Sequence, residues 1–261
     1  VSGLFQCPTV VNNVETVASV PTILEMGGEA WAKIGAPKSG GTRVMQLSGH
    51  VEKPGVYEVT MDTTFRELIY DIGGGITRGR QLKAFIPGGS SCPIMLPKHL
   101  DIKVEFEAIK EASSMAGTGG VIVIDDQTCM VRHAWRTARF YAEESCGQCT
   151  PCREGNPWQT RLLRKIEEGR GTPDDLQLLE SVCSSIAQEV SFVPFALGNT
   201  ICALGEAAAM PTQSVVKYFR EEFEEHIRLG RCPSPCGRKG CPRHFGNSML
   251  DMIETNAHFR P

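Results

Sequence analysis

The feature of this sequence with the clearest chemistry is a run of three cysteines. Cys146, Cys149 and Cys152 lie in ESCGQCTPCREG with two residues between each pair, and Gly147 and Pro151 favour a non-helical turn there. Three thiols at this spacing can face one metal centre. A CxxCxxC run with a remote fourth cysteine is the usual arrangement for a [4Fe–4S] cluster, whereas structural zinc sites more often use two separated pairs. The spacing therefore favours a cluster, with zinc or unligated thiols as alternatives.

The fourth ligand of such a cluster has two candidates in the helical half of the chain, Cys183 and Cys202. Cys183 falls on an apolar stripe with Leu179 and Ile186, which is typical of a buried small hydrophobe. Cys202 lies in GNTICALGEAA, between two glycines and ahead of a helical run, so a loop can present its sulfur. Cys202 is the better candidate. Arg153, next to the triplet, can offset the negative charge of ligated thiolates, or it is simply a solvated arginine.

The bulk composition narrows the class of protein. Eleven cysteines in 261 residues indicate either a disulfide framework or metal ligation, and disulfide scaffolds belong mainly to short secreted chains. A reduced, cytoplasmic compartment fits better. The formal charge of −3 gives no basic surface for nucleic acid. We find no apolar stretch long enough for a membrane span and no secretion signal.

The first half of the sequence predicts an α+β module. Residues 10–27 show helical periodicity, with Pro21 as a break between two short helices. Residues 44–51 and 56–61 are β-rich and joined by EKPG, which predicts a hairpin; a short helix follows in residues 65–76, and strands are expected at 82–89 and 102–108. This order predicts a β-grasp domain of the soluble-ligand-binding type over residues 41–113. VIVIDD, within 114–127, is apolar on both faces and so predicts a central strand.

The second half of the sequence predicts a four-helix bundle, and its end is atypical. Amphipathic segments occupy residues 130–145, 160–169, 173–188 and 214–230, within a helical domain assigned to 128–232. The segment 233–261 is expected to be a poorly ordered tail. With Cys232, its Cys236, Cys241 and His244 have a zinc-like look, although their spacings match no standard ligand pair.

Three segments in order, PTVVNNVETVASVP, ESCGQCTPCREG and TICALGEAAAMP, resemble the NADH-binding flavoprotein subunit of respiratory complex I. Relatives of that subunit occur in NAD-reducing hydrogenases and formate dehydrogenases, and the resemblance covers nearly all of residues 3–233. It implies a [4Fe–4S] cluster on Cys146, Cys149, Cys152 and Cys202. QEVSFVPFAL, residues 188–197, is extra sequence ahead of the last of these cysteines.

The resemblance also implies a flavin and partner subunits. Asn12 and Asn13, with Thr16 as a weaker candidate, match the segment that lines the flavin mononucleotide (FMN) site; helix capping is the alternative. The family's Gly-rich flavin and NADH loop lies ahead of this segment, so residues 1–40 are expected to be the remnant of an FMN domain. The implied partners are a thioredoxin-like [2Fe–2S] subunit and an iron–sulfur-rich subunit.

The expected function is therefore a one-electron relay within a NADH dehydrogenase, peripheral to a membrane. NADH is the substrate of the complete subunit, and this chain is not expected to bind it unaided. Because ligation and burial set the behaviour of such a relay, no side chain is assigned as a catalytic acid or base. The alternatives are a zinc-stabilised interaction module, a subunit of a hydrogenase or formate dehydrogenase, and a truncated product without a cluster.

Overall fold

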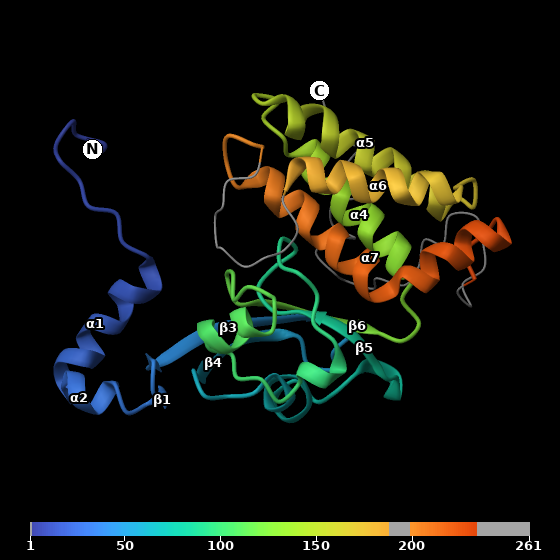
Figure 1. Cartoon of the computed structure of the whole chain (residues 1–261). Helices are drawn as coiled ribbons and strands as arrows, with labels where there is room; N and C mark the ends of the chain where they lie inside the picture. Colours follow the sequence, from blue (N-terminus) through green and yellow to red (C-terminus); the bar gives the residue numbers. More distant parts are fainter. Residues whose placement is uncertain (1, 188–198, 234–261) are drawn as a thin grey trace, which may run out of the picture.

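The computed structural model describes residues 2–187 and 199–233 of the chain. Figure 1 shows a mixed sheet, a layer of helices packed over it, and an N-terminal arm that extends to one side. Strands precede the four long helices along the chain, with the shorter helices outside this layer, so the α+β class is confirmed. No helix in the described part of the chain has the length and apolar character needed to cross a membrane.

The sheet has four strands in the order β4-β3-β6-β5. β3 (Thr42–Gly49) and β4 (Gly55–Thr60) form the predicted antiparallel hairpin, in which Met45 faces Tyr57. β6 (Gly120–Asp125) lies between β3 and β5 (Leu82–Ile86), parallel to the former and antiparallel to the latter. The prediction of a central strand in VIVIDD is confirmed, because β6 has hydrogen-bonded neighbours on both sides.

Alternating side chains of β5 and β6 fill two cores, one on each face of the sheet. Ile86 and Ile124 pack with the helical layer, whereas Phe85 and Val123 pack on the opposite face. On that opposite face the Phe85 ring lies 4.9 Å from the ring of Phe65. Burying one such side chain contributes about 1.5–3 kcal/mol to folding. The sheet therefore holds the helical layer in a fixed place.

The opposite face is covered by short helical segments. These are η1 (Glu67–Ile72), η2 (Thr77–Gly79), η3 (Pro97–His99) and α3 (Phe106–Glu111). The strand expected over residues 102–108 is wrong, because Phe106 already starts α3. The alternation there suggested a strand, but Phe106 is half exposed and stacks under the Arg43 guanidinium, and only Ile109 of the helix is buried.

Four helices form the layer above the sheet. They are α4 (Met130–Glu143), α5 (Thr150–Glu167), α6 (Pro173–Ile186) and α7 (Leu204–Leu229). α6 begins with a capping box, in which the Thr172 and Asp175 side chains each accept from the other's backbone N–H. Their shared core includes Leu163, Leu179 and Phe223, all fully buried.

The N-terminal arm consists of α1 (Val14–Met26), α2 (Gly28–Trp31), β1 (Gly35–Ala36) and β2 (Ser39–Gly40). Pro21 does not break α1 into two helices, as the sequence suggested. Proline removes only the hydrogen bond to the Val17 carbonyl, and Val17 is exposed, so water can satisfy that group. No residue of α1 is buried, and the arm exposes Leu4, Phe5 and Val11.

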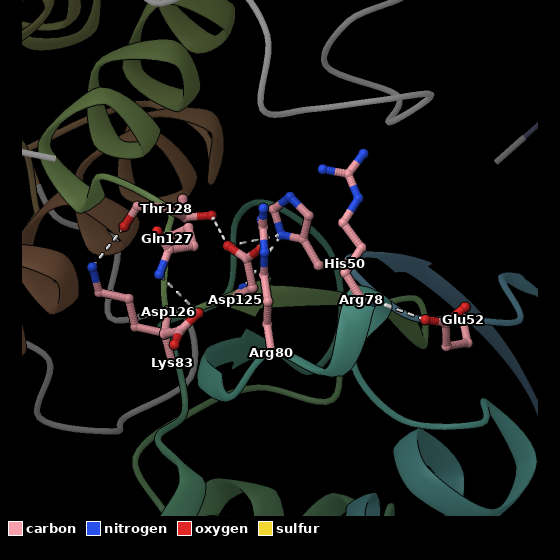
Figure 2. Close-up of polar contacts among 9 residues, drawn as sticks. All are labelled: His50, Glu52, Arg78, Arg80, Lys83, Asp125, Asp126, Gln127 and Thr128. Atoms are coloured by element: carbon pink, nitrogen blue, oxygen red, sulfur yellow. Dashed lines mark hydrogen bonds and ion pairs between the residues drawn. The ribbon is translucent and has the colours of Figure 1, made fainter. Parts of the chain in front are cut away.

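A buried carboxylate anchors the turn between the sheet and the helical layer (Figure 2). Asp125, at the end of β6, accepts hydrogen bonds from Arg80 (2.6 Å) and from the Thr128 hydroxyl (2.7 Å). Its own N–H donates to His50 Nδ1 at 3.3 Å. Burial tends to raise the pKa of Asp125, but the bonds from Arg80 and Thr128 outweigh it and hold the pKa below its ordinary value. The charged carboxylate thus fixes the residues that lead into α4.

Candidate metal centre

The three clustered cysteines lie where α4 gives way to α5. Cys146 follows the end of α4, Cys149 is the N-cap residue of α5, and Cys152 is in its first turn. Gly147 has a φ of 76°, which supports the predicted turn between the first two. Placing all three in a loop was wrong, because the helix starts at Thr150 with Pro151 in its first turn. Proline fits there since the first N–H groups of a helix have no intrahelical partner.

Cys202 lies at the start of a different helix. It is exposed and stands two residues ahead of Leu204, where α7 begins. The Thr200 hydroxyl donates to the Cys202 carbonyl at 2.9 Å, and a Cβ on Gly205 would lie only 2.4 Å from the Thr200 side chain. This close packing explains the glycine after ICAL and fixes the turn that carries Cys202.

The structure brings Cys202 near the three clustered thiols. Burial raises the pKa of the Cys152 thiol, and the negative charges of Cys149, Cys202 and Cys146 raise it further. Such mutual effects require the four sulfurs to lie close to one another. By contrast, Cys183 is fully buried in α6, and burial raises its pKa to about 12. Cys183 is therefore a core residue, as its position on the apolar stripe predicts.

Two polar side chains that the sequence analysis missed contact Cys152. The Asn156 amide donates to Cys152 Sγ at 3.2 Å, and Ser145 Oγ lies 3.2 Å from the same sulfur. Ser145 Oγ also accepts the Gly147 N–H at 3.3 Å, so its own proton is available for the sulfur. Asn156 is one helical turn beyond Cys152, and that i, i+4 spacing was the available signal. Both groups favour a thiolate over a thiol at Cys152.

Positive charge surrounds the four thiols. The N-termini of α5 and α7, two helices of 18 and 26 residues, both begin at this site and direct the positive ends of their dipoles toward it. Arg153 Nη1 donates to the Gly147 carbonyl at 3.1 Å, and Arg153 Nη2 contacts Thr150 Oγ1 at 3.4 Å. Arg153 is therefore not a free surface arginine but a brace across the cysteine turn.

The dimensions of the site favour a cluster over a single ion. Among the described residues, no three of these four thiols have all their sulfurs within 4.8 Å of one another. Tetrahedral zinc with bonds of about 2.3 Å requires sulfurs about 3.8 Å apart. A four-iron cubane spans a larger space and takes four cysteine thiolates, three of them in a compact run. The donor set and its spread therefore fit a [4Fe–4S] cluster.

The predicted flavin residues lie apart, on the N-terminal arm. Asn13 is the N-cap of α1, and its Oδ1 accepts the N–H groups of Glu15 (2.8 Å) and Thr16 (3.4 Å). Asn12 and Thr16 are exposed. The capping role given as the alternative is thus present at Asn13. The extra segment 188–197 lies outside the described residues, as does the tail beyond Pro233.

Comparisons with known proteins agree with this geometry. Residues 132–226 match the NADH-ubiquinone oxidoreductase-F iron-sulfur binding region, and residues 44–95 match the SLBB domain. Similar relatives include bacterial F subunits of NADH-quinone oxidoreductase. The chain is 47% identical over 234 residues to the one numbered 2 in Rhizobium meliloti, and 47% identical over 233 residues to that of Streptomyces coelicolor. These matches cover 89% of this chain, and 53% and 49% of the relatives, so the chain spans about half their length.

Solved structures give the same relationship. The air-oxidized NAD+-reducing [NiFe]-hydrogenase aligns with a TM-score of 0.72 at 28% identity, over 87% of this chain and 37% of that one. The H2-reduced state aligns with a TM-score of 0.72 at 26% identity, over 98% of this chain and 40% of that one.

Proposed function

Residues 132–226 belong to the NADH-ubiquinone oxidoreductase-F iron–sulfur binding family, and we propose on this basis that the chain relays single electrons through a [4Fe–4S] cluster. The ligands in this proposal are Cys146, Cys149, Cys152 and Cys202. The observation that carries it is the convergence of two helix N-termini, each bearing cysteine near its start, on one site. The bound cluster supplies reversible uptake of one electron.

The side chains of the site have defined parts in this proposal. Asn156 and Ser145 donate hydrogen bonds to the sulfur of Cys152, which withdraws charge from that ligand and favours electron uptake. The helix dipoles of α5 and α7 act in the same direction. Arg153 holds the turn in which Cys146 and Cys149 are presented. No proton transfer is required of any of these residues.

We infer the surroundings of this relay from the relatives. In the complete flavoprotein, FMN accepts hydride from NADH, and Asn12, Asn13 and Thr16 lie on the FMN side of this chain. The exposed apolar residues of the arm, such as Phe5 and Val11, are then covered by the flavin-bearing part. The proposed assembly also contains a thioredoxin-like [2Fe–2S] subunit and an iron–sulfur-rich subunit, on the cytoplasmic side of a membrane.

The architecture in this proposal is a β-grasp domain of the soluble-ligand-binding type followed by a four-helix bundle. Its support is the match of residues 44–95 to the SLBB domain, together with the parallel pairing of β3 and β6 in the middle of the sheet. The proposed domain limits are residues 41–113 and 128–232, with 114–127 as the connecting strand.

Replacing one ligand at a time tests the proposed site. After anaerobic reconstitution of the 261-residue chain, Cys202→Ser is expected to lose most cluster absorbance near 400 nm, because a cubane with three thiolates is labile. Cys183→Ser is the matched control and keeps it, since Cys183 is buried in the core. Full iron and sulfide content in Cys202→Ser, with loss in Cys183→Ser, would move the fourth ligand to α6. Zinc without iron or sulfide in the unmodified chain would contradict the redox function and support an interaction module.

A further inference from the structure

A second group of metal-binding side chains lies at the other end of the helical layer. Cys129, His226 and Cys232 place two sulfurs and one imidazole nitrogen within 4.8 Å of one another. Cys129 Sγ is 3.3 Å from His226 Nε2, and a tetrahedral zinc ion would hold a sulfur and a nitrogen about 3.6 Å apart. The three donors thus already lie close to the separations that one ion needs, unlike the four thiols of the candidate metal centre.

Each donor is held in place by its own element. Cys129 is the N-cap of α4, and its sulfur accepts the Arg132 N–H at 3.4 Å, which orients the sulfur at the helix N-terminus. His226 is in the last turn of α7. Its Nδ1 lies 2.6 Å from the Glu222 carbonyl and donates to it, which leaves the Nε2 lone pair directed at Cys129. Metal-bound histidines are oriented in this way.

The turn after α7 returns the chain toward His226. Gly230 has a φ of 61°, the left-handed conformation that ends helices, and Cys232 follows two residues later. The backbone of Gly230 packs so closely on Gly169 that a Cβ on Gly169 would lie 2.1 Å from it. The position of Cys232 is therefore fixed by packing between this turn and the end of α5.

The charged side chains beside these donors pair with one another. Glu222, the carboxylate one turn before His226, accepts the Met130 N–H at 3.0 Å and pairs with Lys83 at 2.6 Å. Lys83 also donates to the Thr128 carbonyl at 2.6 Å, as Figure 2 shows. This network locks the residue before Cys129 and keeps the Lys83 ammonium on Glu222.

We propose that Cys129, His226 and Cys232 bind one Zn2+ ion, with a solvent molecule as the fourth ligand. Two thiolates and one imidazole form a soft, tetrahedral donor set that suits zinc, and three protein ligands with an open fourth position are a known zinc arrangement. The ion joins the start of α4 to the end of α7, two points 97 residues apart in sequence. The site is separate from the four cysteines proposed to hold the cluster.

The test measures zinc in the cluster-loaded chain, so that the other cysteines are already occupied. We expect about one zinc per chain after dialysis against metal-free buffer. The zinc-edge X-ray absorption spectrum should show two sulfur neighbours at about 2.3 Å and at least one nitrogen at about 2.0 Å. Four sulfurs and no nitrogen would overturn the proposal, because that would place the zinc on the cluster cysteines. Recovery of a Cys129–Cys232 disulfide from zinc-loaded protein prepared without oxygen would also overturn it.

Two variants separate ligation from folding. Cys232→Ser changes a partly exposed residue and should weaken zinc binding by at least about 100-fold in competition with a chelator. His226→Gln should remove the nitrogen neighbour from the absorption spectrum. Cys7→Ser, at an exposed cysteine on the N-terminal arm, is the control and should bind zinc unchanged. Equal affinity in Cys232→Ser and Cys7→Ser would refute the site, provided that the circular dichroism spectra of both match the unmodified chain.

Discussion

Removing the Asn156 amide should lower the reduction potential of the proposed cluster. Asn156 is buried and donates one hydrogen bond to Cys152 Sγ at 3.2 Å. A hydrogen bond to a charged acceptor contributes about 1.5–3 kcal/mol. Reduction adds one negative charge spread over all ligands and sulfides, so about 1 kcal/mol of that bond distinguishes the reduced from the oxidised state. Since 1.4 kcal/mol corresponds to 59 mV for one electron, Asn156→Ala should shift the potential by about −40 mV.

The assay is a redox titration of the reconstituted chain, followed by electron paramagnetic resonance of the reduced cluster. Gln159→Ala is the matched control. It removes a buried amide from the same helix, but one that donates to the Ala208 carbonyl and to Thr212 instead of to sulfur. The control is expected to lose stability while keeping its potential. An unchanged or higher potential in Asn156→Ala, or equal shifts in both variants, would refute the reasoning.

Three further predictions concern the fold and the thiols. The folded pKa of Asp125 lies below its ordinary value of 3.8, so its stabilisation is complete above that value and is lost as the pH falls through the folded pKa; Asp125→Asn should lower the free energy of unfolding in urea by roughly 3 kcal/mol at pH 7, and a constant difference down to pH 3 would contradict this. Gly49→Ala should cost at least about 2 kcal/mol in the same assay, because Gly49 has a φ of 84° and an added Cβ would lie 2.2 Å from the Val123 carbonyl oxygen. In the cluster-free chain, iodoacetamide at pH 8 should label exposed Cys146 and Cys202, whereas Cys92 and Cys183, whose pKa values burial raises to about 11 and about 12, should react only after unfolding; equal labelling by peptide mass spectrometry would contradict that burial.

Local patterns predicted well wherever neighbours in sequence decide the structure. The hairpin of β3 and β4 followed from two β-rich runs around a short turn, and the helices from apolar spacing. The pattern failed at residues 102–108, where a tertiary contact of Phe106 with Arg43 accompanies a helix instead of a strand. It also failed at Pro21, since exposure of Val17 makes the lost hydrogen bond tolerable.

The candidate sites show the same limit more sharply. The spacing of Cys146, Cys149 and Cys152 is visible in the sequence, but the contact of Asn156 with Cys152 depends on α5 starting at Thr150, well before the helical segment that the apolar spacing predicted. The proximity of Cys202 required a resemblance to a family. The group around Cys129 could not be read at all, because its donors are brought together only when α4 and α7 pack.

The central claim is most directly tested by the iron and acid-labile sulfide content of the anaerobically reconstituted chain. A [4Fe–4S] cluster on the four proposed cysteines predicts about four iron atoms and about four sulfides per chain, in addition to any zinc. Zinc at about two ions per chain, with no iron and no sulfide, would contradict it and leave all seven metal-binding side chains with a structural role.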